Sequence, residues 1–267
     1  MINLEELILF LSIIRINSNY IDGTELYDSI LIYMPRLNKF TFSIDISVIK
    51  TNFEIALSSN EDIQRSFNRK EYGPVASHVE TFSRENESEG HAYSLPYEFN
   101  NRCHIYSLPY QFESFKFLTI NSFQGGMFDN VLNLHITDLR PFEHNFFKLI
   151  AENFPLLKYL YIINDEPQID KHQSITPIVF PRLILLGLLL AHTNYTEQFL
   201  IDKRCHLPCL TNLHIRYKSL AQVTNNFTND ATRSTCGTLT CLHIGGMFFP
   251  IEGFYEYFPN CRKYYFC

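Results

Sequence analysis

The chain of 267 residues contains no tryptophan, no run of lysine or arginine, and no long apolar segment. Its formal net charge is -6, and without a basic segment it offers little to the phosphate backbone of a nucleic acid. The first apolar segment, residues 7–14, is too short to span a bilayer and lacks the positive start and cleavage site of a signal peptide. We therefore expect neither a nucleic-acid partner nor a membrane partner, and a cytoplasmic or nuclear location.

The common motifs of catalysis are absent too. The sequence has no Gly-x-Ser-x-Gly nucleophile turn, no His-Glu-x-x-His metal motif and no acidic calcium loop. The spacing of Cys205, His206 and Cys209 would suit zinc, but the seven cysteines are odd in number and scattered, which is typical of reduced, buried thiols. We expect a protein that is not an enzyme, with no catalytic residue, no metal and no cofactor.

A repeated frame of apolar residues organises most of the chain. Its clearest copy is Phe154–Ile162, in which the order apolar-Pro-x-Leu-x-x-Leu-x-Ile is complete. Further copies with the proline begin at Met34, Phe180, Leu207 and Phe258. Copies that keep only the apolar spacing are Leu4, Leu7, Leu9; Phe115, Leu118, Ile120; Val131, Leu134, Ile136; and Leu239, Leu242, Ile244. Units that begin at residues 128, 154, 180, 207 and 236 lie 26, 26, 27 and 29 residues apart.

Each copy of the frame has a simple structural meaning. The proline ends a helix, and the last two apolar residues stand two apart, so a strand points both to the same side. One unit cannot bury its own apolar side and stacks on the next, and repeats of about 20 to 29 residues are typical of leucine-rich repeats. We expect an α/β leucine-rich-repeat solenoid, with a curved, mostly parallel sheet on the concave side and helices on the convex side. A doubly wound sheet is the alternative, but the two Gly-Gly pairs lack the rest of a phosphate-binding turn.

Helices are predicted between the strands. The first is expected at residues 25–33, before the frame that starts at Met34. Later ones are expected at residues 142–153, 195–203, 219–227 and 252–257. In the helix at 142–153 the spacing places Phe146, Leu149 and Ile150 toward the core.

The frame is lost in one part of the chain. The expected organisation is a single leucine-rich-repeat-like domain over residues 1–267, with N-terminal repeats at 1–46, an irregular insert at 47–111 and regular repeats at 112–267. Within the insert, a short helix is expected from Asn60 to about Asn68 and a strand at residues 77–82. The segments His91–Phe99 and His104–Phe112 agree at seven of nine positions, which indicates a tandem duplication. Loops accept insertions more readily than core elements do, so we expect this duplication in a surface loop.

Binding is expected on the side of the sheet that faces away from the core. The residue between the two inward ones points to this open side, and across strands about 4.8 Å apart such residues form a column. The column is His135, Tyr161, Gly187, His214, His243 and Tyr265. The predicted partner-binding residues are Tyr159, Tyr161, Ile163, Leu185, Leu189, His135, His214, Arg216 and His243. Aromatic residues and arginine dominate interface energetics, although tyrosine and histidine also simply tolerate a half-exposed strand.

The neighbouring positions of His214 and His243 leave two further interpretations open. Two imidazoles side by side are the beginning of a metal site, or of a switch that responds to pH. The sequence places no carboxylate or third ligand beside them. We therefore keep them in the predicted protein-binding surface.

With this frame, residues 1–46 and 112–267 resemble the leucine-rich-repeat arm of F-box proteins, the substrate receptors of cullin-based ubiquitin ligases. The resemblance implies a curved scaffold that holds a target protein, while a separate F-box segment docks to the ligase adaptor. No Leu-Pro-initiated helical segment of that kind precedes the first repeat, so an adaptor is expected as a partner only if an F-box segment exists outside this chain.

The expected function is therefore a non-enzymatic protein-binding module. It would be the substrate-recognition arm of an F-box-like ubiquitin-ligase receptor and would bind a protein target on its concave strand face. The alternative is a structural or self-associating repeat scaffold without a ligase role, in which the ends of the array stack on each other.

Overall fold

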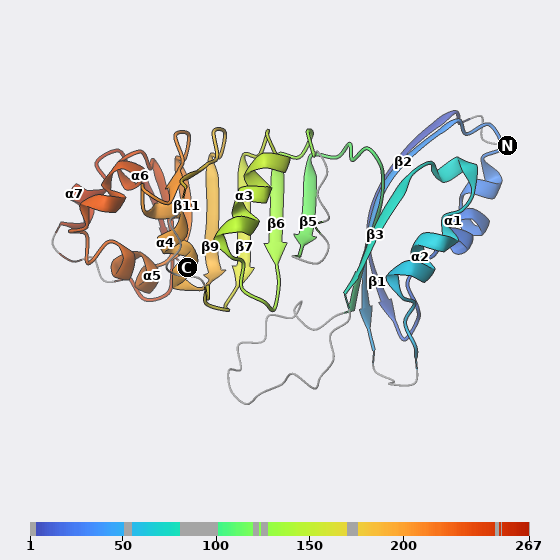
Figure 1. Ribbon diagram of the computed structural model, residues 1–267, viewed down its shortest axis with the longest axis horizontal. Helices are drawn as coiled ribbons and strands as arrows, with labels where there is room; N and C mark the ends of the chain where they lie inside the picture. Colours follow the sequence, from blue (N-terminus) through green and yellow to red (C-terminus); the bar gives the residue numbers. More distant parts are fainter. Residues whose placement is uncertain are drawn as a thin grey trace. The chain divides into compact units, whose positions relative to one another are not determined.

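The computed structural model describes residues 4–50, 55–80, 101–119, 123, 128–169, 176–248, 251 and 253–266. The chain divides into two compact units, Met1–Tyr110 and Gln111–Cys267. Each unit has its own large sheet, and both sheets are drawn in Figure 1. The single domain over residues 1–267 stays a prediction. None of the helices in the described part of the chain is long and apolar enough to cross a membrane.

The first unit is a mixed sheet with helices on one face. Its elements are β1 (Glu6–Ile16), α1 (Gly23–Ser29), the 3-10 helix η1 (Leu31–Tyr33), β2 (Lys39–Ile49), α2 (Asn60–Ser66), the 3-10 helix η2 (Lys70–Tyr72), β3 (Val75–Glu80) and β4 (Asn101–Ser107). The strand order is β1-β2-β4-β3, with β1 parallel to β2 and β4 antiparallel to both of its neighbours. Helices α1 and α2 lie on the same face (Figure 1), where Leu26 and Ile63 share one core with Phe40 and Phe42.

The two copies of the frame in this unit pair as their spacing predicts. Leu7 lies opposite Phe40, and Leu9 lies opposite Phe42, in an unbroken parallel register. The parallel pairing of the first two predicted strands is therefore confirmed. The helix predicted at residues 25–33 is divided, because α1 ends at Ser29 and η1 follows it.

The stretch expected to be an irregular insert, residues 47–111, is regular where the structure describes it. It contains α2, β3 and β4, and β4 lies between β2 and β3 with Cys103 and Ile105 fully buried. The second copy of the duplication, which starts at His104, begins inside β4 and is not a surface loop, whereas the first copy lies outside the described residues. The helix expected from Asn60 is confirmed as α2, and the expected strand from Ser77 lies in β3. The surface-loop prediction for the second copy is wrong, because β4 joins the sheet antiparallel. Such a strand needs only alternating side chains and carries no repeat frame.

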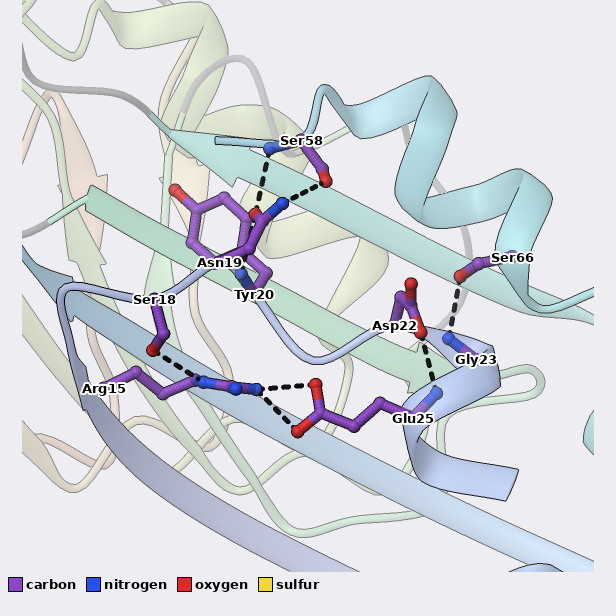
Figure 2. A network of polar contacts seen from close by, with 9 residues as sticks. All are labelled: Arg15, Ser18, Asn19, Tyr20, Asp22, Gly23, Glu25, Ser58 and Ser66. Atoms are coloured by element: carbon purple, nitrogen blue, oxygen red, sulfur yellow. Dashed lines mark hydrogen bonds and ion pairs between the residues drawn. The ribbon is translucent and has the colours of Figure 1, made fainter. Parts of the chain in front are cut away.

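A polar network holds the chain just after β1. Figure 2 shows the Arg15 guanidinium against both carboxylate oxygens of Glu25, at 2.8 and 2.9 Å, with its Nε donating to Ser18 Oγ at 3.0 Å. Asp22 caps α1 by accepting a hydrogen bond from the backbone N–H of Glu25. Both contacts with Glu25 come from Arg15 Nη1, and these charge-assisted hydrogen bonds tie the end of β1 to the start of α1.

The same network brings α1 against α2. The N–H of Gly23 donates to Ser66 Oγ at 2.8 Å, and Asn19 Nδ2 donates to Ser58 Oγ at 2.8 Å (Figure 2). A Cβ at position 23 would lie 2.3 Å from the carbonyl oxygen of Ser66. This approach of two helices therefore requires glycine.

The second unit is built on a large parallel sheet. Its elements are β5 (Ser114–Leu118), β6 (Asn133–Thr137), α3 (His144–Asn153), β7 (Tyr159–Asn164), β8 (Ile178–Val179), β9 (Leu185–Ala191), α4 (Thr193–Leu200), β10 (Cys205–His206), β11 (Asn212–Arg216), α5 (Tyr217–Val223), the 3-10 helix η4 (Asp230–Thr232), α6 (Arg233–Gly237), β12 (Cys241–Gly245), α7 (Phe254–Tyr257) and β13 (Lys263–Phe266). Seven strands lie in the order β13-β12-β11-β9-β7-β6-β5, and each pairs parallel with its neighbours. Figure 1 shows β5, β6, β7, β9 and β11 side by side in chain order. The short strands β8 and β10 pair with each other.

The strand order places the helices on one face of this sheet. Each strand of the sheet is followed in the chain by its neighbour on the same side. Crossover connections between parallel strands are right-handed, so all of these connections pass over the same face of the sheet. Burial alternates accordingly: in β7, Leu160 and Ile162 are buried, while Tyr159, Tyr161 and Ile163 are half-buried. The opposite face of the sheet, which we call the open face, therefore carries the residues between the core positions.

The four helices predicted in this unit, α3, α4, α5 and α7, begin within about two residues of their predicted positions, whereas α6 was not predicted. Phe154 is the C-cap of α3, and its N–H donates to the carbonyl of Ile150, so Phe154-Pro155 ends the helix as the frame predicts. One inward residue was predicted wrongly. Leu149 is 46% exposed, and the side chains that α3 buries are Phe146, Phe147 and Ile150. Each residue of a helix is rotated by about 100° from the one before it, and this rotation directs Phe147, and not Leu149, toward the core.

Candidate binding site on the open face

One residue from each of six strands forms a continuous column on the open face. The paired positions are His135, Tyr161, Gly187, His214, His243 and Tyr265, as expected from the frame. Strands β6, β7, β9, β11, β12 and β13 each contribute one of them. We call the five ring-bearing members, without Gly187, the ring column.

The rings of this column contact one another along the sheet. His135 stacks on Tyr161 with ring centroids 4.4 Å apart, and Tyr161 meets His214 edge-on at 6.3 Å. His214 lies 4.8 Å from His243, whose ring is 6.0 Å from that of Tyr265. Five rings therefore line the open face from β6 to β13, at the separations that aromatic pairs prefer.

Gly187 explains how the column crosses β9 without a ring. A Cβ at this position would lie 2.4 Å from Cδ1 of Tyr161, so the tyrosine ring leans over the glycine. Strands two apart in a sheet are separated by roughly 9.6 Å, yet the rings of Tyr161 and His214 are only 6.3 Å apart. The missing side chain at position 187 thus lets Tyr161 reach the next ring.

Burial favours the neutral forms of three members of the column. The pKa of the His135 imidazole is lowered by burial and, to a smaller extent, by Lys116. The pKa of His214 is lowered by burial and then by the neighbouring His243, and the pKa of the Tyr161 hydroxyl is raised by burial. At neutral pH these three groups therefore present neutral rings with hydrogen-bond donors and acceptors.

The lowered pKa values predict that acid destabilises the second unit. Below the ordinary value of 6.5, the unfolded chain takes up protons on His135 and His214 that the folded chain binds only at lower pH. Stability should thus fall as the pH drops through this window, which a urea titration at about pH 7.5 and about pH 5 would measure. A His135→Gln, His214→Gln variant should show a weaker dependence. The control is His206→Gln, at an exposed residue, and an unchanged slope in the double variant would contradict the assignment.

Arg216 flanks the ring column and is held by two contacts. Its Nε donates to the backbone carbonyl of Leu189 at 2.6 Å, and its Nη2 lies 3.5 Å from Asp165 Oδ1. The Asp165 side chain is largely exposed, so this ion pair contributes little to stability. The guanidinium is therefore oriented by the carbonyl and remains able to bind a carboxylate.

Two of the predicted binding residues lie elsewhere than expected. Leu185 is only 8% exposed, so it belongs to the core more than to the surface. Leu189 was expected beside Ile163, but a register shift between β7 and β9 places Leu190 there. Tyr161 pairs with Gly187 and Ile163 with Leu190, so β9 contains three steps where β7 contains two. The extra residue in β9 moves Leu189 away from Ile163.

The other predicted residues lie on the open face as expected. Tyr159, Ile163 and Arg216 are half-buried and flank the ring column on β7 and β11. Sequence reasoning missed Leu190, which the apolar run Leu188–Leu190 made ambiguous, and the contact between Tyr161 and Gly187. Partner binding by these residues stays a prediction.

The described residues contain no group of three or more His, Cys, Asp or Glu side chains placed to hold a metal ion. His214 and His243 thus stand as a pair in the part of the chain that the structure describes. Of the cysteines whose spacing would suit zinc, Cys205 is buried and Cys209 is exposed. Burial raises the pKa of the Cys205 thiol, which disfavours the thiolate that a metal requires.

Comparison of the chain with protein-family models, curated proteins and solved structures found no match. The function is therefore inferred from the geometry of the open face.

Proposed function

We propose that this chain is a non-enzymatic protein-binding module that captures a protein target on the open face of its seven-stranded sheet. The observation that carries the proposal is the ring column, because five rings from five strands contact one another on the face opposite the helices. Rings that are already held in place lose little conformational freedom when a partner binds. Tyrosine and arginine are also the residues that most often dominate binding energy at interfaces.

The proposal extends to the architecture. Strands in chain order, a repeated register and helices returning on one side support a leucine-rich-repeat solenoid, with the sheet on its concave side. In that arrangement the ring column lies along the concave surface. A target would then lie across several strands at once and not against a single loop.

The chemistry of the surface indicates what kind of target fits. The neutral rings offer stacking and hydrogen bonds, Tyr159 and Ile163 add apolar area, and Arg216 adds one positive charge. A segment with aromatic or proline residues and one acidic side chain opposite Arg216 would complement it.

The resemblance to F-box proteins supports a narrower proposal. In it, the chain is the substrate-recognition arm of an F-box-like ubiquitin-ligase receptor. Binding to the ligase adaptor would then require an F-box segment outside this chain. The target and the adaptor are therefore separate partners with separate tests.

Photo-crosslinking from two matched tyrosines tests the binding face. Tyr265 is 52% exposed at the end of the ring column, whereas Tyr255 is 59% exposed on α7 and packs against Tyr264, a core-side residue of β13. With benzoylphenylalanine in place of Tyr265, we expect one defined adduct with a target protein in a cell extract. The same group in place of Tyr255 should give no such adduct.

Mass spectrometry of the crosslinked material separates the broad proposal from the narrow one. Equal adducts from both positions would remove the open face as the binding site. The ligase adaptor among the co-purified proteins would support the receptor role, and its absence would leave a stand-alone binder.

A further inference from the structure

Among the residues that the structure describes, the strand β1 is an unprotected sheet edge. It lies at one end of the four-stranded sheet, runs for 11 residues and pairs with β2 without a break in register. It contains no proline and no lysine. Its one internal charge, Arg15, is bound by Glu25 (Figure 2), so it does not guard the edge. Natural edge strands usually carry proline, lysine or another exposed charge that prevents pairing, because a long, regular edge is a template for another strand.

The other edge strands of the two large sheets are shorter, and two of them contain a lysine that hinders pairing with a further strand. β13 has four residues and begins with Lys263, while β5 has five residues, includes Lys116 and changes register between Phe115 and Leu118. β3 has six residues. Within the part of the chain that the structure describes, β1 is the edge that combines length, regularity and apolar character.

The direction of the backbone groups can be read from the two ends of β1. The carbonyl of Glu5 accepts from Lys39 N, and the N–H of Asn17 donates to the carbonyl of Ile49, so the odd-numbered residues bond to β2. In a strand, successive residues direct their N–H and C=O groups to opposite edges. The even-numbered residues, including Ile8, Ser12 and Ile14, therefore direct theirs to the outer edge.

The side chains of β1 also leave apolar surface uncovered. Ile8, Phe10, Ile14 and Ile16 are between 47% and 64% exposed on one side of the strand. On the other side, Leu7, Leu9, Leu11 and Ile13 are only partly buried against the core. A partner strand would cover both sides, and burial of apolar area favours association.

We propose that β1 pairs antiparallel with β1 of a second copy of this chain, forming a dimer whose continuous sheet has four strands from each copy. With the two-fold axis at Ser12, Ile8 of one copy lies opposite Ile16 of the other, and Phe10 lies opposite Ile14. The residues that meet are then those whose backbone groups point outward, so each such pair exchanges two hydrogen bonds. The apolar pattern is its own complement, as a symmetric interface requires.

Charge selects the antiparallel arrangement. A parallel pairing would bring Glu5 and Glu6 of one copy beside the same residues of the other. In the antiparallel pairing, the Glu5 and Glu6 side chains of the two copies lie at opposite ends of the interface. The exposed apolar residues of β1 are symmetric about Ser12, which favours a second copy over an unrelated strand.

The oligomeric state of the full chain tests the proposal. We expect sedimentation of the wild type to give twice the 31.4 kDa of the chain, and the Ile8→Lys, Ile14→Lys variant to give the monomer mass. Both replaced side chains are 62% exposed, so the fold of the unit is expected to survive, as circular dichroism would show. The matched control is Leu139→Lys, Ile169→Lys, two exposed positions in the second unit, which should stay dimeric.

Hydrogen exchange gives an independent readout. In the dimer the amides of Phe10, Ser12 and Ile16 should exchange more slowly than in the lysine variant, by on the order of tenfold or more, because each then donates a hydrogen bond across the interface. The amides of Leu9 and Leu11, which face β2, should be protected in both. A wild type that stays monomeric overturns the proposal and leaves the edge to another partner. A lysine variant that stays dimeric overturns it as well. Neither result bears on the open face of the second unit.

Discussion

Replacing Tyr161 by aspartate is expected to abolish capture of the protein target. The substitution removes the ring that stacks on His135 at 4.4 Å and reaches His214 at 6.3 Å, so the ring column is cut in two. It also places a carboxylate among groups that burial keeps uncharged, where a bound partner would remove the water that solvates it. We expect a loss of affinity on the order of 30-fold or more, which corresponds to about 2 kcal/mol, the size of an interface hot spot.

The measurement is a pull-down with the immobilised chain, followed by titration of the captured protein. Tyr33→Asp is the matched control, because Tyr33 is 65% exposed in the first unit and is replaced by the same charge. Capture by this control should equal capture by the wild type. Equal capture by Tyr161→Asp, with the circular dichroism spectrum unchanged, would exclude the ring column as the binding surface. Leu185 is not a suitable second position, because it is buried and its replacement would disturb the core.

The register of the parallel sheet could be predicted from the sequence because it follows from two short periods. Within a strand, side chains alternate every two residues, and between strands the frame returns after nearly constant intervals. Those two facts are enough to align His135, Tyr161, His214 and His243 across four strands, and the structure pairs them in that way. The parallel pairing of β1 with β2 was predictable for the same reason.

The parts that could not be predicted depend on contacts that the frame does not encode. The extra residue in β9 lies inside the run Leu185–Ala191. Nearly every residue there is apolar, so no alternation of apolar and polar residues shows which side chains face the core. β4 pairs antiparallel with both of its neighbours, so its sequence does not contain the repeated frame that would have predicted a strand there. The contact of Tyr161 with Gly187 depends on which way a ring leans, and spacing alone does not determine a rotamer.

These differences change where function is expected on the open face. The apolar patch predicted around Leu185 and Leu189 is reduced, because Leu185 is buried and Leu189 is displaced from Ile163. The ring column is strengthened, because its members contact one another. Specificity should therefore depend more on the rings and on Arg216 than on the leucines.

Replacing Gly187 by alanine is expected to lower the free energy of unfolding of the second unit by about 1 to 3 kcal/mol, the usual cost of overpacking. The new Cβ would lie 2.4 Å from Cδ1 of Tyr161, which a ring held against His135 cannot accommodate without leaving its place. The backbone at Gly187 is not in the left-handed region, so the clash alone carries this cost. Urea unfolding of the variant and the wild type measures it.

A double-mutant cycle shows whether Tyr161 is the cause. In the Tyr161→Ala background the added methyl group meets no ring, and Gly187→Ala should be neutral or stabilising by about 0.4 to 1 kcal/mol, because alanine restricts the unfolded chain. Gly237→Ala in α6 is the control without a clash, since a Cβ there meets nothing within 4 Å. If Gly187→Ala costs the same in both backgrounds, the glycine is needed for another reason. If the cost disappears with the ring, the glycine is there to let the ring column cross β9.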